Sequence, residues 1–437
     1  MPSPPSQGDP APASVTPRQP ENGLPRAFTS LRHRNYRLFW FGQMISLIGS
    51  WMQSIGQTWL VLELSHSAIQ IGLVGALQSL PVLLFSLLGG VFADRWSKRR
   101  VLLWTQSAAM VQAFLVWALI VTGTVQLWHV YVLALLLGLT NCLGRPTSQA
   151  FVVELVGRLD LPNAVALNSS LSNLTRIVGP GLGGIIIATS GVGTLFLLNA
   201  LSFIAPIVGL ALIHSRDLHA QAPRHANAGA RQTTWQSLRE GVTYVRDTPA
   251  TAWVILVVGF VLLFGSNFNV VLPLMATDVL HVGATGFGFL SAASGVGSLI
   301  VALWLAWSHQ QPTIRRVLIG TLAFGGLEAV FAVSHVYPLS LVLIASVGGA
   351  EIAFATLAIT MLQTSAPDHL RGRVMSVCIL FFDGSVPLGY LLMGWLAGRY
   401  GPSIALLIGA LLSLLVAGAG WLWRNPAGTS FAAPARL

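Results

Sequence analysis

Charged residues are scarce in this sequence: Asp, Glu, Lys and Arg make up 9% of its 437 residues, whereas a soluble globular protein carries about 25%. The two cysteines, Cys142 and Cys378, lie within apolar runs, so no disulfide framework or thiolate metal site is indicated. His-Glu-x-x-His and Walker sequences are also missing, which argues against a metalloenzyme and a nucleotide-driven pump. We therefore expect no enzyme activity, no metal and no cofactor.

Apolar residues are abundant instead, at 54% of the chain, and they gather in long runs separated by short polar breaks. A run of about 20 apolar residues crosses a bilayer as a helix. No alternating pattern typical of barrel strands is visible, so the backbone must satisfy its polar groups in helices. The sequence predicts an all-α membrane protein with twelve transmembrane helices, at 36–62, 68–92, 101–122, 128–153, 163–188, 192–213, 251–276, 286–307, 315–335, 338–365, 374–397 and 403–423.

Basic residues indicate how the spans are oriented. With the N-terminus inside, 22 of the 24 Lys and Arg residues are assigned to the cytoplasmic side, and Arg145 is one of these 22. The two others are Arg399, in an outer loop, and Arg176, within the fifth span. Because Lys and Arg are retained on the cytoplasmic side, we expect a multi-pass cell-membrane protein with both termini in the cytoplasm. The net charge of +10 then reflects topology and contact with anionic membrane lipids rather than nucleic-acid binding.

One polar stretch, residues 214–250, is longer than a tight loop and divides the spans six and six. Its second part carries apolar residues at helical spacing, at Trp235, Leu238, Val242 and Val245. This pattern predicts either an amphipathic helix in the membrane interface or a plain helical lead into the seventh span. The expected organisation is a disordered N-terminal tail at 1–35, a six-helix half at 36–213, a cytoplasmic linker at 214–250, a second six-helix half at 251–423 and a C-terminal tail at 424–437.

The two halves resemble each other when the second is laid over the first. Such parallel repeats are related by an axis along the membrane normal and predict a substrate cavity between the halves near the bilayer midplane. The matching positions are Leu64, Ala68 and Gly72 with Leu280, Ala284 and Gly288, and Arg176 and Pro180 with Asp383 and Pro387.

The loop between the second and third spans reads Gly-Val-Phe-Ala-Asp-Arg-Trp-Ser-Lys-Arg-Arg. It resembles the Gly-x-x-x-Asp-Arg-x-Gly-Arg-Lys signature of the major facilitator superfamily, with Ser97 where that family prefers Gly. The resemblance implies the major facilitator fold and a gating loop in which Asp94 latches the two halves in the state closed to the cytoplasm. An ordinary positive-inside loop is the alternative. The gating-loop residues would be Gly90, Asp94, Arg95, Lys98 and Arg99.

A glycine-rich stretch in the fifth span formally matches a dinucleotide-binding fingerprint, but it lies inside an apolar helix rather than after a strand. It resembles the motif on span five of the superfamily's proton antiporters, although Thr175 replaces one upstream glycine. That resemblance favours export. Its residues are Gly179, Pro180, Gly183 and Gly184, small residues that also allow neighbouring helices to approach closely.

Two further stretches narrow the resemblance to one branch of the superfamily. They read Gln-Ala-Phe-Val-Val-Glu-Leu from Gln149 and Leu-Arg-Gly-Arg-Val-Met-Ser from Leu370. Both are similar to the enterobactin-exporter-like branch, the transmembrane secretion effectors. Members of that branch export siderophores or assorted drugs, so the resemblance does not identify a substrate.

Four ionisable residues stand out within the predicted spans, because such a group costs about 2.5 to 3.5 kcal/mol at mid-helix. Arg176 and Asp383 occupy matching positions in the two halves, and we rank them first. Arg176 would bind an anionic substrate group or tune a carboxylate, since it stays charged, while Asp383 would carry a proton. Glu351 is the second candidate for proton coupling. Glu328 lies in the ninth span, which the resemblance to the superfamily implies is an outer support helix, where it would bond a neighbour or stay protonated. A purely structural pairing of Arg176 with Asp383 is the alternative.

The sequence therefore predicts a monomeric secondary active transporter, working by alternating access. We expect it to export a siderophore-like or drug-like small molecule in exchange for protons. An importer of a small solute on the same fold is one alternative, and a non-transporting membrane receptor is another.

Overall fold

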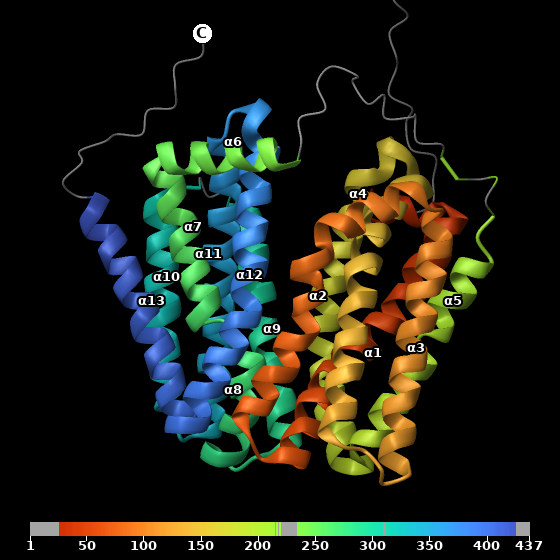
Figure 1. Ribbon diagram of the computed structural model, residues 1–437, viewed down its shortest axis with the longest axis horizontal. Helices are drawn as coiled ribbons and strands as arrows, with labels where there is room; N and C mark the ends of the chain where they lie inside the picture. Colours follow the sequence, from red (N-terminus) through yellow and green to blue (C-terminus); the bar gives the residue numbers. More distant parts are fainter. Residues whose placement is uncertain (1–25, 215, 217, 220–233, 309–311, 425–437) are drawn as a thin grey trace, which may run out of the picture.

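The computed structural model describes the backbone of residues 26–214, 216, 218–219, 234–308 and 312–424. Within these ranges, the side chains of 26–27, 86–95, 234–238, 368–369 and 424 lie outside the description. The described residues form helices without a strand. Eight of the helical stretches are long and apolar enough to cross a membrane. Figure 1 shows two bundles of helices side by side.

The N-terminal half has six spans, three of which belong to one continuous helical stretch. This stretch, α4, has 76 residues, and at 1.5 Å per residue it is far longer than a bilayer is thick. It is interrupted at Gly157 (φ 72°) and Gly191 (φ 80°), which adopt the left-handed conformations that glycine allows. The elements are η1 (Arg26–Arg32), α1 (Arg34–Ser65), α2 (Ala68–Arg95), α3 (Lys98–Val121), α4 (Leu127–Ser202) and α5 (Ile204–Ala211), the last continuing the sixth span.

The C-terminal half also has six spans, and the first of them is broken. Between α7 and α8 the chain leaves the helix, and the Asn267 side chain donates hydrogen bonds to the carbonyl oxygens of Leu262 and Leu263 at 3.2 and 3.0 Å. The break therefore leaves fewer backbone groups unsatisfied. The elements are α7 (Pro249–Phe264), α8 (Phe268–Leu274) with the π-helical turn η3 (Met275–Val279), α9 (Gly283–Ser308), α10 (Ile314–Ala332), α11 (Tyr337–Ser365), α12 (Asp368–Tyr400) and α13 (Pro402–Arg424). The predicted all-α fold with twelve membrane helices is confirmed.

The linker contains a helix, α6 (Thr234–Asp247), which lies across one end of the second half (Figure 1). It packs against α12, because a Cβ added at Gly241 would lie 2.8 Å from the Arg373 carbonyl oxygen. Glu240 forms an ion pair with Arg373, and the Tyr244 hydroxyl donates to the Ser365 carbonyl oxygen at 3.1 Å. We call this side of the molecule the α6 end.

At the end opposite α6, the two halves meet backbone to backbone. A Cβ at Gly184 of α4 would lie 2.9 Å from the Cα of Gly288 in α9, and a Cβ at Gly394 of α12 would lie 2.8 Å from the carbonyl oxygen of Ala68 in α2. At the α6 end the bundles diverge (Figure 1). With the α6 end in the cytoplasm, as the basic residues predict, this arrangement faces inward.

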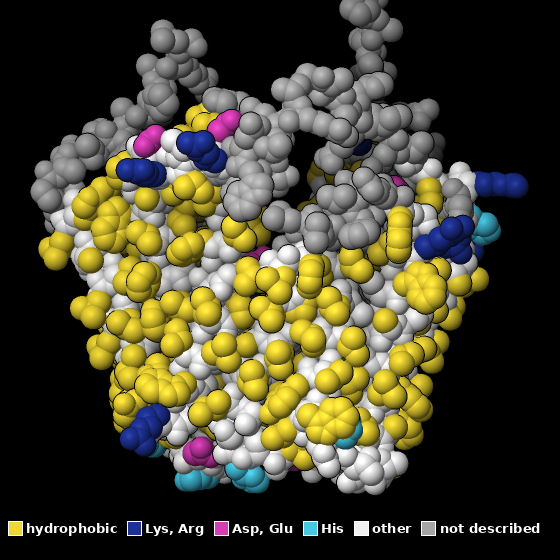
Figure 2. Space-filling view, in the orientation of Figure 1, with side chains coloured by type: hydrophobic (Ala, Val, Ile, Leu, Met, Phe, Trp, Pro, Cys, Tyr) yellow, Lys and Arg dark blue, Asp and Glu magenta, His cyan; other side chains and the backbone are white. Residues whose placement is uncertain are grey.

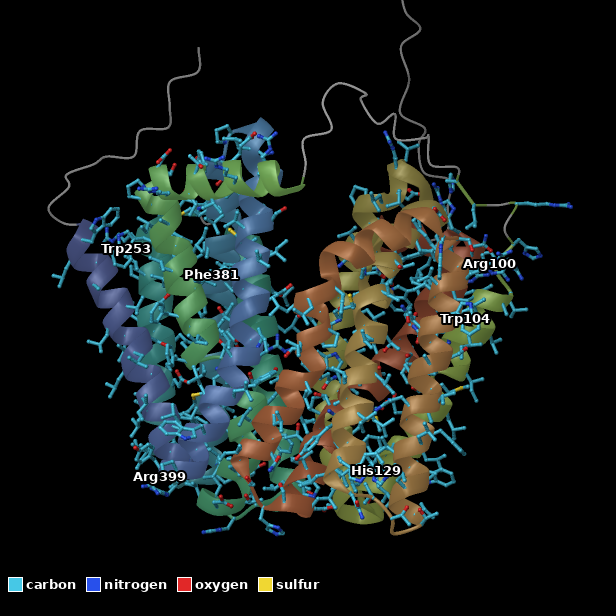
Figure 3. All side chains as sticks on the ribbon, in the orientation of Figure 1. Arg100, Trp104, His129, Trp253, Phe381 and Arg399 are labelled. Atoms are coloured by element: carbon cyan, nitrogen blue, oxygen red, sulfur yellow. The ribbon has the colours of Figure 1, made fainter. Side chains whose placement is uncertain are left out.

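The surface pattern agrees with a membrane-embedded body. Figure 2 shows hydrophobic side chains over the whole flank, while charged side chains gather at the two ends. Figure 3 places Arg100 at the α6 end and Arg399 at the other end, the two sides to which the sequence assigns them.

The orientation predicts a simple topology result. A reporter fused after Arg424 and one inserted near Ala230 should both report the cytoplasm, whereas one inserted near Gly191 should report the outside, because Lys and Arg are retained inside. Alkaline phosphatase and fluorescent-protein fusions measure this directly. A reversed pattern at any of the three positions would contradict the predicted orientation.

Candidate functional site

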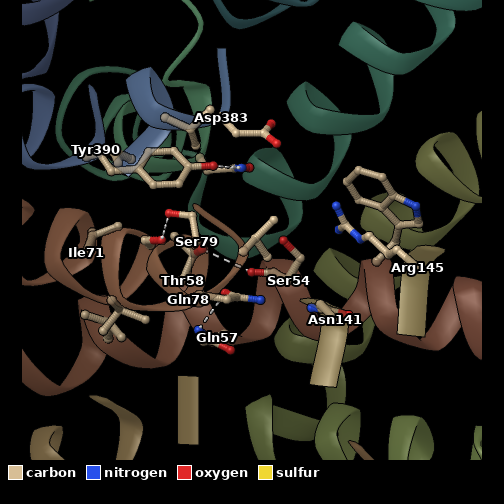
Figure 4. Close-up of a pocket in the computed structure, with 18 residues that line it drawn as sticks. Ser54, Gln57, Thr58, Ile71, Gln78, Ser79, Asn141, Arg145, Asp383 and Tyr390 are labelled. Atoms are coloured by element: carbon tan, nitrogen blue, oxygen red, sulfur yellow. Dashed lines mark hydrogen bonds between the residues drawn. The ribbon is translucent and has the colours of Figure 1, made fainter. Parts of the chain in front are cut away.

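A cavity of about 310 Å³ lies between the two halves, as the internal repeat predicts. Helices α1, α2 and α4 of the first half and α8 and α12 of the second half supply its wall. Most of its polar groups are amides and hydroxyls (Figure 4). They belong to Ser54, Gln57, Thr58, Gln78, Ser79, Asn141, Asn269 and Tyr390.

Two charged side chains of opposite sign line this cavity, Asp383 from α12 and Arg145 from α4. Figure 4 shows both charged groups pointing into the space between the halves. The assignment of Arg145 to the cytoplasmic side is therefore wrong. Helix α4 continues without a break past Pro146 to Gly157, so Arg145 lies within the fourth span and faces the cavity.

The cavity amides are joined in pairs that fix their orientation. The Gln57 side chain donates to the Gln78 carbonyl oxygen at 3.2 Å, and Asn269 donates to the Tyr390 hydroxyl oxygen at 3.1 Å. Sequence reasoning missed Arg145, Asn141 and Tyr390 as wall residues. For the first two a signal existed, since residues four apart lie on one face of a helix.

Arg176 does not line the cavity, although its repeat partner Asp383 does. It lies on α4 where that helix meets α9, and a Cβ at Gly295 of α9 would come 3.4 Å from the Arg176 carbonyl oxygen. The structure therefore places Arg145, and not Arg176, on the cavity wall together with Asp383.

Glu328 on α10 has a different environment from the other ionisable groups. Its side chain is 0% exposed, and neither of its carboxyl oxygens has a hydrogen-bond partner among the described residues. An unpaired carboxylate in such a place costs several kcal/mol. This burial favours the neutral form of Glu328, one of the two alternatives that the sequence leaves open.

The predicted gating loop joins α2, which ends at Arg95, to α3, which begins at Lys98. The side chains of Gly90, Asp94 and Arg95 lie outside the described residues. Lys98 forms a 2.6 Å ion pair with Glu154 at the end of the fourth span. Arg99 donates to the carbonyl oxygens of Leu210 and Ala211, each at 2.7 Å. These two residues thus tie the loop to its own half.

The glycine motif of the fifth span packs against helices on two sides. Gly179 faces Trp51 of α1, and a Cβ at Gly183 would lie 3.4 Å from the Cα of Met52. Gly184 and the Pro180 carbonyl oxygen instead meet α9 of the other half, the latter 2.7 Å from a Cβ at Gly288. The motif is helical and so lacks the strand and turn of a dinucleotide site.

Two six-helix halves around a polar cavity with opposite charges define a membrane transporter of the major facilitator type, not an enzyme. The sequence pattern of the transmembrane secretion effector family matches residues 26–436. The chain belongs to that family, and the predicted resemblance is confirmed.

Several curated relatives match across most of their length. The chain is 30% identical to the multidrug efflux pump Tap of Mycolicibacterium fortuitum, over 83% of this chain and 89% of that protein. It is 23% identical to the staphyloferrin A transporter of Staphylococcus aureus (84% and 90% covered). It is 25% identical to the enterobactin exporter EntS of Shigella boydii (88% and 92% covered).

Solved structures show the same fold at low sequence identity. A bacterial homologue of the human lysosomal transporter Spinster, in an inward-facing and unoccupied conformation, has a TM-score of 0.72 and 10% identity. The match covers 92% of this chain and 98% of that one.

Proposed function

We propose that this protein is a proton-coupled exporter of a polar small molecule across the cell membrane, acting as a monomer. One observation carries the proposal: an arginine and an aspartate share a cavity between two halves that are closed at one end. Relatives named as a multidrug efflux pump and an enterobactin exporter support the direction. The apolar flank in Figure 2 supports surrounding lipid as the other partner.

The charges suggest the class of substrate. Arg145 stays protonated and suits an anionic group such as a carboxylate, while ionised Asp383 accepts hydrogen bonds from hydroxyl or amine groups. The amides and hydroxyls of the wall suit further polar groups. The substrate we propose is therefore a small molecule that carries both an acidic group and hydroxyl or amine donors.

Coupling follows from competition at Asp383. From the α6 end, an ionised Asp383 binds the donors of the substrate. At the other side of the membrane, a proton neutralises Asp383, its hydrogen bonds to the substrate weaken, and the substrate leaves. The proton is then released when the cavity again opens to the α6 end. Arg145 stays charged throughout.

Transport in membrane vesicles tests direction and coupling. We suggest a probe panel of radiolabelled hydroxycarboxylates and fluorescent amine-bearing drugs. Inside-out vesicles with an acidic lumen should accumulate a transported probe, because the lumen then corresponds to the outside of the cell. Accumulation only in right-side-out vesicles would show import, and specific binding without transport in either orientation would show a receptor.

We propose that Asp94 acts as the latch of the gating loop, on the strength of the sequence signature alone. Asp94→Asn should leave the protein inserted and folded but cripple turnover, because the charge that would meet the N-terminus of α12 is lost. The population should shift toward the inward-facing state. Efflux rates together with cysteine accessibility measure both effects, and full transport by Asp94→Asn would exclude the role.

A further inference from the structure

A groove between α10 and α13 lies apart from the cavity between the halves, with which it shares no lining residue. In Figure 1, α13 lies at the outer edge of the second bundle, next to α10. The groove has a volume of about 670 Å³ and an apolar wall. The wall is formed by Ile319, Leu322 and Ala323 of α10 and by Gly418, Trp421 and Leu422 of α13.

The two helices touch deeper in the bundle and part toward the α6 end. A Cβ at Gly325 would lie 3.0 Å from the Ala410 carbonyl oxygen, whereas a Cβ at Gly418 would have no described atom within 4 Å. The residues along the opening are exposed, Ile319 by 47% and Leu422 by 70%. The described residues therefore leave an apolar floor, which an acyl chain of the surrounding membrane can fill.

A positive charge stands at the mouth of this groove. The guanidinium carbon of Arg315 lies 6.0 Å from the centroid of the Trp421 ring, a cation–π distance, and Trp421 is itself part of the wall. The Trp253 and Trp423 rings pair at 5.6 Å, and Figure 3 places Trp253 at the α6 end. Because tryptophan is enriched at the level of the lipid head groups, the mouth lies at head-group depth.

The guanidinium group of Arg315 is available to a ligand. In the first half, Arg99 is the second residue of α3 and donates to the Leu210 and Ala211 carbonyl oxygens, each at 2.7 Å. Arg315 is the second residue of α10, the helix at the same place in the second half. It is exposed and makes no hydrogen bond or ion pair within the described part of the chain. Its N–H donors are therefore not spent on the end of α13.

No acidic side chain of these two helices cancels the charge. Helix α13 has no Asp or Glu, and the acidic residue of α10, Glu328, lies about three and a half turns beyond Arg315. Arg316 adds a second positive charge next to Arg315. A guanidinium group binds phosphate oxygens in pairs, and basic pockets between membrane helices bind anionic head groups.

We propose that the groove between α10 and α13 is a binding site for an anionic phospholipid of the leaflet at the α6 end. The phosphate group binds Arg315, the glycerol region lies against the Trp421 indole, and an acyl chain fills the groove over Gly418 and Ala323. This goes beyond general contact with lipid, because one charge and one groove select one class of lipid at one place. The site is separate from the substrate cavity and does not depend on the direction of transport.

Photolabelling of the purified full-length protein tests the site. The probe is phosphatidylglycerol with a diazirine in the upper part of one acyl chain, added to nanodiscs of phosphatidylcholine. Light should attach it to residues 319–323 and 418–422, which peptide mass spectrometry detects. Unlabelled phosphatidylglycerol should compete at least about five times better than phosphatidylcholine, the effect expected of one basic side chain.

Two kinds of variant separate the head-group contact from the groove. Arg315→Gln should abolish the preference for phosphatidylglycerol and leave labelling by a phosphatidylcholine probe unchanged, whereas Arg315→Lys should keep most of the preference. Gly418→Leu should reduce labelling by both probes, because its side chain fills the groove. If Gly418→Leu does not insert, Ala323→Leu narrows the same groove from α10.

Matched controls use the same substitutions elsewhere. Arg399→Gln removes an exposed arginine at the opposite end of the molecule. Gly326→Leu adds a leucine at another position of α10 where a Cβ would have no described atom within 4 Å. Both variants should label as the wild type does.

Four results would overturn the proposal. Equal competition by the two lipids, or a preference that survives Arg315→Gln, would show ordinary contact with bulk lipid. Labelling that survives both Gly418→Leu and Ala323→Leu would place the acyl chain elsewhere. Soluble glycerol phosphate that competes as well as the lipid would show a site for free phosphate esters, and a dimer in native mass spectra that excludes the probe would show a second copy of the chain.

Discussion

Gly184→Val should abolish transport and hold the protein open at the end away from α6. In the structure α4 and α9 touch through glycine at this end, and a Cβ at Gly184 would lie 2.8 Å from the Ala284 carbonyl oxygen and 2.9 Å from the Cα of Gly288. These neighbours are backbone atoms, so they cannot move aside without shifting α9. Overpacking of this kind costs about 1–3 kcal/mol, and each ~1.4 kcal/mol shifts an equilibrium tenfold.

Thiol accessibility measures that shift. A cysteine introduced at Ser54 reports on the cavity wall, and the native Cys142 and Cys378 are buried, which keeps the background low. When the Ser54 cysteine is combined with Gly184→Val, it should react with a membrane-impermeant reagent added outside at least about ten times faster than it does without Gly184→Val, as a shift of ~1.4 kcal/mol requires. Without Gly184→Val, the same cysteine should react with reagent added from the inside.

Gly326→Val is the matched control, because it also places a β-branched residue within a membrane helix. A Cβ at Gly326 would have no atom within 4 Å among its described neighbours. This variant should transport normally and label as the wild type does. Equal loss of transport in both variants would point to a general effect of valine, and normal transport by Gly184→Val would exclude the glycine contact as the closure.

The predicted fold rested on the strongest signal in the sequence, the length and number of the apolar runs. Hydropathy recognises a span whichever way the helix is rotated. It therefore located α4 as three spans, and the structure places the breaks at Gly157 and Gly191. Hydropathy does not report which face of each helix looks into the cavity, because that depends on how twelve helices pack.

Arg145 illustrates this limit. The predicted fourth span, 128–153, includes Arg145, but the positive-inside rule assigned this residue to the cytoplasmic side. The helix continues past Pro146 to Gly157, because proline is tolerated in membrane helices when its neighbours satisfy the freed groups. Similarly, the repeat places Arg176 and Asp383 at matching positions, but their side chains have different neighbours. Only packing determines that Asp383 lines the cavity and Arg176 does not.

Asp383→Asn should permit substrate exchange but remove uphill export. Asparagine has the shape of the protonated aspartate and stays neutral at every pH, so the cavity keeps its volume and its amide lining. Substrate can still bind and move down its own gradient, because that requires only the alternation of one cavity. An imposed pH gradient should drive no net transport of substrate, because the Asp383 carboxylate, for which proton and substrate compete, is gone. Counterflow and gradient-driven uptake in the same inside-out vesicles measure the two activities.

Glu351→Gln in the same assay separates the two candidates for proton coupling. With Glu351 neutral, the competition at Asp383 remains, so uphill export should continue. Asp383→Glu, which keeps the carboxylate, should restore part of the driven uptake that Asp383→Asn loses. Loss of all driven transport in Glu351→Gln, with Asp383→Asn unaffected, would move the coupling to α11. Asp383 would then serve to bind substrate and to balance the charge of Arg145.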